Sequence, residues 1–170
     1  MNRSTRQCAG LIVGLAALTA TAFGGLSGLA PAGAAPPNPC KILKKSEIQS
    51  AFGGTVSSGK KGLSTAVTTQ CDFDVSPDGD RPAGTVTVHV MFKNGKIAYK
   101  GLKKETSQYQ PIEGVPNSLW QETTHAAEVL VGDTLVGVQG GFLITDPLPI
   151  HSYDDKAQLT KLVQTAAKRV

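Results

Sequence analysis

The chain has 170 residues, and removal of an N-terminal leader would leave about 135, the size of one ordinary domain with its own hydrophobic core. The leader holds two of the seventeen basic residues and none of the thirteen acidic ones, so the mature part has a formal net charge of +2. Although the sequence pI is about 9.0, so small an excess of positive charge argues against nucleic acid as a partner.

Residues 1–34 have the layout of a secretory signal peptide. Two arginines precede an uncharged stretch from Ala9 to Ala30, and small residues follow it, so we expect cleavage after Ala34 or Ala35. An uncleaved membrane anchor is the alternative, which the Gly, Ala and Thr content and the lack of Lys or Arg before Lys41 disfavour. No cysteine directly follows the stretch, which disfavours a lipid anchor. We therefore expect a secreted or wall-associated protein.

Cleavage would remove Cys8 and leave Cys40 and Cys71 in an oxidising compartment, where such thiols pair with each other. A disulfide between them is predicted, with free or separately paired thiols as the alternative. By the chain-entropy estimate, such a bond lowers the freedom of the unfolded chain by about 3.5 kcal/mol.

The first half of the mature chain predicts one helix and two strands. Residues 35–39 form a proline-rich, extended lead-in, and a single domain is expected over 40–170. Ser46-Glu47-Ile48-Gln49 resembles a capping box and predicts a short helix that ends at Gly53-Gly54, followed by a loop or irregular edge over 55–64. Thr, Val and Phe content and alternation predict neighbouring antiparallel strands, joined by an enlarged loop at 76–82; they span Ala66 to Val75 and Gly84 to Phe92.

The second half predicts a helix, a stiff connector, two or three strands and a terminal helix. The first helix follows the apolar spacing of Ile97, Ala98, Leu102 and Tyr109. Gly140-Gly141 is interpreted as a strand break, and Ser152 as the start of the last helix, whose apolar stripe runs from Leu159 to Val170. The predicted segments are Lys96–Tyr109, the connector Pro111–Pro116, and strands Leu119–Thr124, Ala126–Val131 and Thr134–Gln139.

This order of elements predicts the fold class. Short connections between consecutive strands, above all the two-residue turn Gly132-Asp133, favour antiparallel pairing. We therefore expect an α+β domain with an antiparallel sheet of about four to five strands, helices packed on one face, and one disulfide.

The acidic loop between the first two strands matches half of a calcium-binding motif. Asp74-x-Ser76-x-Asp78-Gly79 fits the start of an EF-hand loop, but Pro82 occupies the ninth position and Thr85 the twelfth, where a glutamate is needed. A solvated hairpin loop is favoured over calcium, and no metal or other cofactor is predicted.

The three histidines His89, His125 and His151 have no zinc-binding spacing. His89 lies opposite the valine face of its strand. It is therefore either exposed to solvent or, if a helix covers that side, a buried polar group that needs a partner. No nucleophile can be assigned to it, so no catalytic residue is predicted.

Four lysines are candidates for an anion-binding face. Lys96, Lys100, Lys103 and Lys104 would share one broad side of the predicted helix. A solvated face is the simpler interpretation, and binding of an anionic envelope component, wall polymer or lipid headgroup, is the functional one.

Several short motifs carry a family resemblance. They are Pro39 to Ile48 with Phe52-Gly53 after it, then Gln70 to Phe73, Pro111 to Trp120, and the helix from Leu159 to Ala167. This series resembles small exported domains, often lipoproteins, that are abundant in actinobacteria. The resemblance implies an α+β fold with both cysteines bonded, and it carries no assigned activity. The alanine-rich cleavage site stands where those domains usually have an acylated cysteine, which argues against a membrane tether.

Three functions are consistent with these features. The first is a non-enzymatic binding module, secreted or associated with the envelope, whose partner is a protein or an envelope component. The second is a secreted inhibitor that would present the loop from Ser76 to Pro82 to another protein. An enzyme is the third, and it would need two titratable groups converging in one pocket.

Overall fold

The computed structural model describes residues 36–78, 82–142 and 155–170. The signal-peptide prediction, His151, and Ser152 as the start of the last helix therefore lie outside the described residues. The elements in chain order are the 3₁₀ turn η1 (Pro39–Lys41), α1 (Lys45–Phe52), β1 (Lys60–Ser64), β2 (Thr68–Val75), β3 (Gly84–Met91), α2 (Gly95–Leu102), β4 (Tyr109–Gln110), β5 (Ser118–Gln121), β6 (Ala126–Val131), β7 (Thr134–Phe142) and α3 (Asp155–Ala167).

The strands form one antiparallel sheet in the order β1-β2-β3-β7-β6-β5-β4. The α+β class with an antiparallel sheet is as predicted, but the sheet has seven strands and not four to five. The two additional strands are its edges. β1 lies where a loop or irregular edge was expected, because its sequence KKGLS is mostly polar and its side chains are largely exposed. β4 has only two residues, too few for a periodic pattern.

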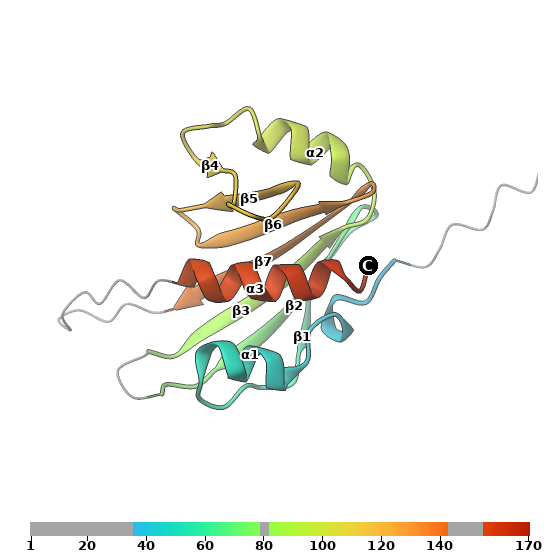
Figure 1. Cartoon of the computed structure of the whole chain (residues 1–170). Helices are drawn as coiled ribbons and strands as arrows, with labels where there is room; N and C mark the ends of the chain where they lie inside the picture. The colour runs from blue at the N-terminus through green and yellow to red at the C-terminus, as the bar shows by residue number, and fades with distance from the viewer. Residues whose placement is uncertain (1–35, 79–81, 143–154) are drawn as a thin grey trace, which may run out of the picture. The chain divides into compact units, whose positions relative to one another are not determined.

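One face of the sheet carries the main core. The alternating valines Val86, Val88 and Val90 of β3 are completely buried, as are Val136 and Val138 of β7. Figure 1 shows α1 and α3 lying over this face, and α3 buries most of the predicted apolar stripe against it: Leu159, Leu162, Val163 and Ala166 are at most 3% exposed. Val170, the last residue of that stripe, lies beyond the helix and is 37% exposed. Each fully buried valine or leucine stabilises the fold by about 1.5–3 kcal/mol.

The prediction that all helices lie on one face is wrong, because α2 packs on the other. Its Tyr99 clusters with Leu119 and Leu135, whereas α3 packs against Val136. Leu135 and Val136 are successive residues of one strand, so their side chains point to opposite faces. The apolar cluster around Leu135 is covered by Tyr99 of α2.

The helix predicted over 96–109 is also too long. It ends at Leu102, and turns then lead to Tyr109. Tyr109 belongs to β4 and pairs with Gln121 of β5. Gly101 sits in the last turn, where glycine weakens a helix by about 1 kcal/mol relative to alanine. Ile97 was assigned to the apolar spacing, yet it is 70% exposed.

Gly140 and Gly141 continue β7 and do not break it. Gly140 pairs with Val86 and Gly141 with Thr85. A Cβ atom on Gly140 would lie 3.2 Å from the ring of Phe142 and 3.3 Å from Leu159. The absence of a side chain at this position therefore leaves room for an aromatic ring and a core leucine.

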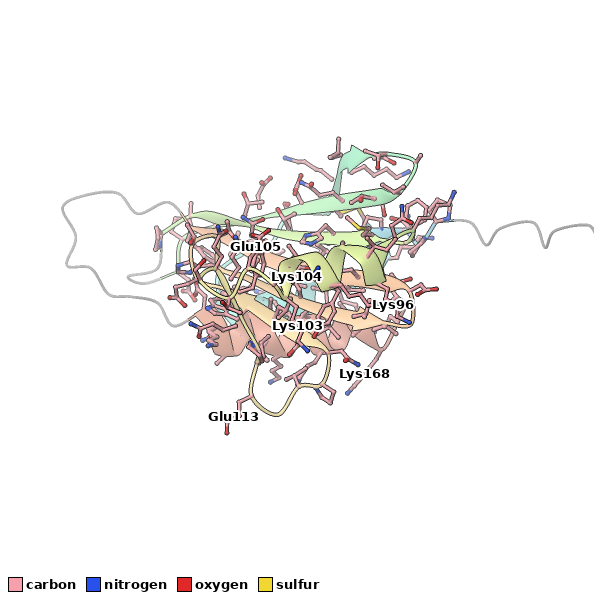
Figure 2. The ribbon with its side chains drawn as sticks, turned by 90° about the horizontal axis from the view of Figure 1, so that it is seen from above. Lys96, Lys103, Lys104, Glu105, Glu113 and Lys168 are labelled. Atoms are coloured by element: carbon pink, nitrogen blue, oxygen red, sulfur yellow. A yellow bond between two sulfur atoms is a disulfide. The ribbon has the colours of Figure 1, made fainter. Side chains whose placement is uncertain are left out.

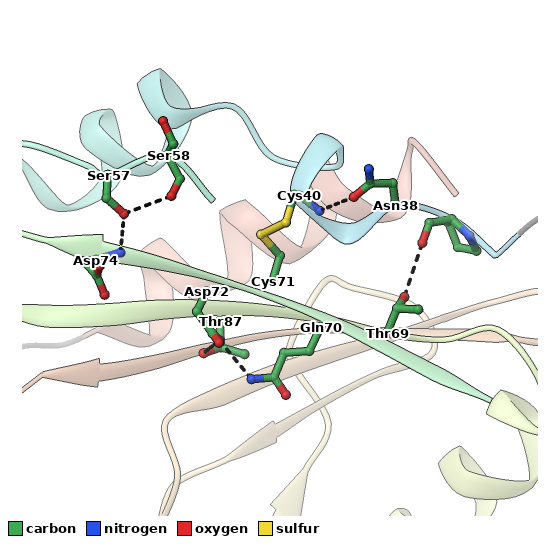
Figure 3. Close-up of a disulfide and its surroundings, with 11 residues drawn as sticks. Asn38, Cys40, Ser57, Ser58, Thr69, Gln70, Cys71, Asp72, Asp74 and Thr87 are labelled. Carbon is green, nitrogen blue, oxygen red and sulfur yellow. Dashed lines mark hydrogen bonds between the residues drawn. A yellow bond between two sulfur atoms is a disulfide. The ribbon is translucent and has the colours of Figure 1, made fainter. Parts of the chain in front are cut away.

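The predicted disulfide is confirmed. Cys40 of η1 and Cys71 of β2 are bonded, with an S–S distance of 2.10 Å and Cα atoms 5.1 Å apart (Figure 3). Two hydrogen bonds support it: the Cys40 N–H donates to Asn38 Oδ1 at 3.1 Å, and the Thr69 hydroxyl donates to the Pro37 carbonyl at 3.3 Å. The proline-rich lead-in is thereby fastened to the sheet.

A second fastening joins residues 122 positions apart. The Arg169 guanidinium donates to both oxygens of Glu47, at 2.8 and 2.5 Å, and to the Ile42 carbonyl. Glu47 also accepts the Lys44 N–H at the start of α1, so this residue, and not the Gln49 of the expected capping box, caps the helix. The hydrogen bonds from Arg169 outweigh partial burial and lower the Glu47 pKa to about 2.

Loss of the disulfide should destabilise the fold. Cys40→Ser or Cys71→Ser should lower the free energy of unfolding by about 2–5 kcal/mol, because the unfolded chain regains the conformational freedom that the cross-link removes. The double variant should cost little more than either single one, since both remove the same link. Urea unfolding of the three variants tests this, and additive losses would contradict it.

The ion pair between Arg169 and Glu47 should make the stability of the fold sensitive to acid. The folded pKa of Glu47, about 2, lies below the ordinary value of 4.5, so its contribution is present above about pH 4.5 and is lost as pH falls towards 2. Arg169→Gln should flatten this part of a plot of urea midpoint against pH. Lys168→Gln, which removes a neighbouring exposed charge, should leave the acid limb as it is.

Candidate functional site

Two features of the sequence fix how α2 sits on the sheet. Asn94 adopts the left-handed conformation with φ of 64° and turns the chain from β3 into the helix. Gly95 follows, and a Cβ atom there would lie 2.4 Å from the Asp133 carbonyl oxygen and 2.4 Å from the Leu135 nitrogen. Only glycine allows so close an approach of the helix to the β6–β7 turn.

With this inner side buried, the outer side of α2 carries the predicted lysines. Lys96, Lys100, Lys103 and Lys104 are all exposed, and Figure 2 shows the labelled Lys96, Lys103 and Lys104 around this helix. Lys103 and Lys104 come just after the helix end, where backbone bonds to Tyr99 and Gly101 continue the turn. We call these four residues the lysine face.

The lysine face has no internal neutralisation in the part of the chain that the structure describes. The ion pairs found there involve Lys60, His89, His125 and Arg169, and none of the four lysines takes part in them. Ile97 is exposed on the same side. The result is a surface with four exposed ammonium groups, with the exposed Glu105 next to Lys104 and the exposed Ile97 next to Lys100.

A second polar cluster lies on the sheet face that α2 partly covers. His89 of β3 and Glu128 of β6 reach across β7, with His89 Nε2 2.9 Å from Glu128 Oε1. Gly137 of β7 lies between them and pairs with both residues. A Cβ atom on Gly137 would be 2.1 Å from His89 Nε2 and 2.6 Å from Glu128 Oε2, so this glycine makes the pair geometrically possible.

Burial and charge act in opposite directions on this histidine. Burial disfavours the imidazolium, but the Glu128 carboxylate, through its charge and hydrogen bond, outweighs it and raises the His89 pKa above 6.5. Glu128 is only 7% exposed, and within the described ranges its Oε2 atom has no hydrogen-bond partner. Burial, and then the charges of Glu128 and Glu105, also raise the pKa of Tyr109.

For His89 the sequence allows either exposure to solvent or burial with a partner, and the structure lies between the two, because the side chain is 25% exposed and is bonded to Glu128. Glu128 was not identified from the sequence. The available signal was a single carboxylate within the apolar run Ala126–Val131, since a buried charge needs a counter-charge. On the same face Asp72 accepts hydrogen bonds from Gln70 at 2.9 Å and Thr87 at 2.8 Å (Figure 3).

The residues of the half-matched calcium motif hold a loop in place. Asp74 pairs with Lys60 at 2.8 Å, the Ser76 hydroxyl accepts the Thr55 N–H at 2.7 Å, and Asp78 accepts the Gly54 N–H at 3.1 Å. Gly79 lies outside the described residues. Among those described, no three His, Cys, Asp or Glu side chains form a group that could hold a metal ion.

The remaining described histidine lies elsewhere. His125 Nδ1 is 3.7 Å from Asp155, and its ring centroid is 6.0 Å from that of Trp120. A surface hollow of about 180 Å³ lies between the proline lead-in and the β1–β2 edge, lined by residues that include Pro37, Lys61 and Gln70. It is smaller than ordinary small-molecule sites, which occupy about 300–1,000 Å³.

Removal of the Glu128 charge should lower the His89 pKa. Glu128→Gln leaves burial as the dominant influence, so His89 should titrate well below its wild-type value in an NMR pH titration. The exposed Glu113→Gln is the matched control and should not change it. A wild-type His89 pKa below 6.5 would contradict the ion pair.

The same pair should contribute stability that depends on pH. Because the folded pKa of His89 is raised, its contribution is fully present below pH 6.5 and is lost as pH rises through the folded value. His89→Gln should cost about 2 kcal/mol at pH 6, since it leaves a buried carboxylate without a counter-charge. Urea unfolding at pH 6 and pH 9 measures both effects, and a wild-type stability that does not change over this range would contradict them.

Comparisons with known proteins returned no relative. No family model, no curated protein and no solved structure matches the chain.

Proposed function

We propose that this chain is an exported, non-enzymatic binding module that holds an anionic component of the cell envelope on its lysine face. The observation that carries the proposal is the array of four exposed lysines without an ion pair, two on α2 and two in the turn that follows it; the position of this helix is fixed by Gly95 and Tyr99. A solvated lysine on a flexible loop loses side-chain and backbone freedom when it binds. A rigid array has already lost the backbone part, so it presents positive charge at low entropic cost.

Electrostatics support an anionic ligand. Charges exposed to solvent interact over about 10 Å at 0.1 M salt, which is comparable to the length of α2. The two lysines on α2 and the two directly after it therefore act on a ligand together. Each lysine close to an anionic surface contributes about 1 kcal/mol, so the array can bind a polymer or headgroup layer that no single lysine would hold.

Export is part of the proposal. The layout of residues 1–34 supports it, and the disulfide between Cys40 and Cys71 is compatible with an oxidising compartment. No helix among the described residues is long and apolar enough to cross a membrane.

The two other functions have less support. The inhibitor hypothesis depends on the loop at 76–82, whose residues 79–81 lie outside the described ranges, and the described Ser76 and Asp78 bind the backbone of Thr55 and Gly54. The enzyme hypothesis could draw on His89 with Glu128 or on His125 with Asp155, but in each of these pairs the two groups contact each other. A structural role explains both sets of contacts.

Charge removal on the lysine face tests the proposed function. The change of all four lysines to glutamine should weaken binding to soluble polyphosphate, and to vesicles with anionic headgroups, by roughly a thousandfold. A matched variant that changes the equally exposed Lys41, Lys45, Lys161 and Lys168 removes the same net charge and should bind nearly as well as wild type.

Salt dependence provides the second part of this test. Wild-type binding should fall steeply between low salt and 0.3 M, because screening shortens the range of each charge. If neither probe binds at low salt, the lysines are only a solvated face of the protein and the proposal is contradicted.

A further inference from the structure

The lysine face contains one side chain that electrostatics does not explain. Ile97 is 70% exposed, more than Leu63 at 62% and Val170 at 37%, which are the other large hydrophobic residues exposed among those described. It lies at the border of the basic array: Lys100 follows three residues later and occupies the neighbouring position of the helix surface.

No neighbouring group on the helix surface prevents Ile97 from inserting into an apolar environment outside the protein. Gly101, four residues on and thus next to Ile97 on the helix surface, has open space where a side chain would lie, with no atom within 4 Å. The inner residues Gly95 and Tyr99 are buried against the sheet, so the helix cannot turn Ile97 inward. The isoleucine therefore remains exposed, next to Lys100 on the helix surface.

Two classes of anionic ligand place different demands on this surface. A soluble polyanion neutralises the lysines but offers nothing to an isoleucine. A bilayer with anionic headgroups serves both, because its phosphates meet the ammonium groups while its acyl boundary accepts an apolar side chain. Lysine side chains also suit such a boundary, since their alkyl stems lie along apolar surface while the charged ends stay at the phosphates.

We propose that the anionic ligand of the lysine face is a lipid bilayer surface, on which α2 lies flat with Ile97 inserted at the headgroup boundary. This inference rests on the proposed function and specifies its partner. The attachment is peripheral and reversible: one short helix side and four charges hold the domain on the membrane without a spanning segment. Charge complementarity, together with the exposed apolar side chain beside the charges, favours this occupant over a polymer.

The test compares a vesicle with a soluble polyanion that carries the same kind of charge. The exported protein is titrated with vesicles of phosphatidylcholine containing about one third phosphatidylglycerol, with pure phosphatidylcholine vesicles, and with soluble polyphosphate. Ile97→Ser should weaken binding to the anionic vesicles about tenfold and leave polyphosphate binding unchanged. Leu63→Ser, which removes a similarly exposed apolar side chain from β1, is the matched control and should change neither.

A spectroscopic readout locates the insertion. Ile97→Trp should shift its fluorescence to shorter wavelength on anionic vesicles and not with polyphosphate, because only the bilayer removes the ring from water. The native Trp120 is 2% exposed, so its emission stays constant. Unchanged vesicle binding of Ile97→Ser, or no wavelength shift, would overturn the inference.

The outcomes separate this inference from the proposed function. If polyphosphate binds and anionic vesicles do not, or if both bind with no role for Ile97, the bilayer inference is wrong while the anion-binding function stands. If neither probe binds at low salt, both are wrong. Loss of vesicle binding in Ile97→Ser, with the lysine-dependent polyphosphate binding intact, supports both.

Discussion

The pairing of β3 with β7 is the constraint on which the rest of the structure depends. It joins residues 84–91 to residues 135–142 at the centre of the sheet, and it decides which side chains share a face. Valines of both strands then point to one side, where α3 covers them. His89, Leu135 and Gly137 point to the other side and create the places where Glu128 and α2 are held. Both helix layers and the lysine face follow from this register.

Two glycines determine the packing on the second face of the sheet, as the buried valines do on the first. Gly137 leaves the space in which an imidazole and a carboxylate meet above a strand, and Gly95 lets the first turn of α2 touch the backbone of the β6–β7 turn. Neither residue contributes apolar area. Each permits a close approach that a methyl group would prevent, so the position of the helix that carries the lysines is set by missing side chains as much as by the buried Tyr99.

The sequence was most informative where a pattern repeats over many residues. The alternation of β3, the Gly132-Asp133 hairpin, the stripe of α3 and the cysteine pair could all be predicted, because each reflects one local rule. The edge strands could not, since β1 is mostly polar and β4 has two residues. The site was half predictable: the four lysines were identified by charge and spacing. The contact of His89 with Glu128 depends on three strands and on Gly137, and spacing along the chain contains no trace of such a contact. Likewise, Ile97 fits an apolar period equally well whether it faces inward or outward.

The contact between Arg169 and Glu47 has a consequence for the order in which the chain can fold. Synthesis releases the N-terminal residues first. Glu47 is therefore available before its partner, which lies 122 residues further along the chain, and β3 is likewise available before β7. Neither the Arg169 contact of α1 nor the central strand pairing can form until the C-terminal part of the chain is present. The domain is thus expected to close late, after nearly the whole sequence has been made.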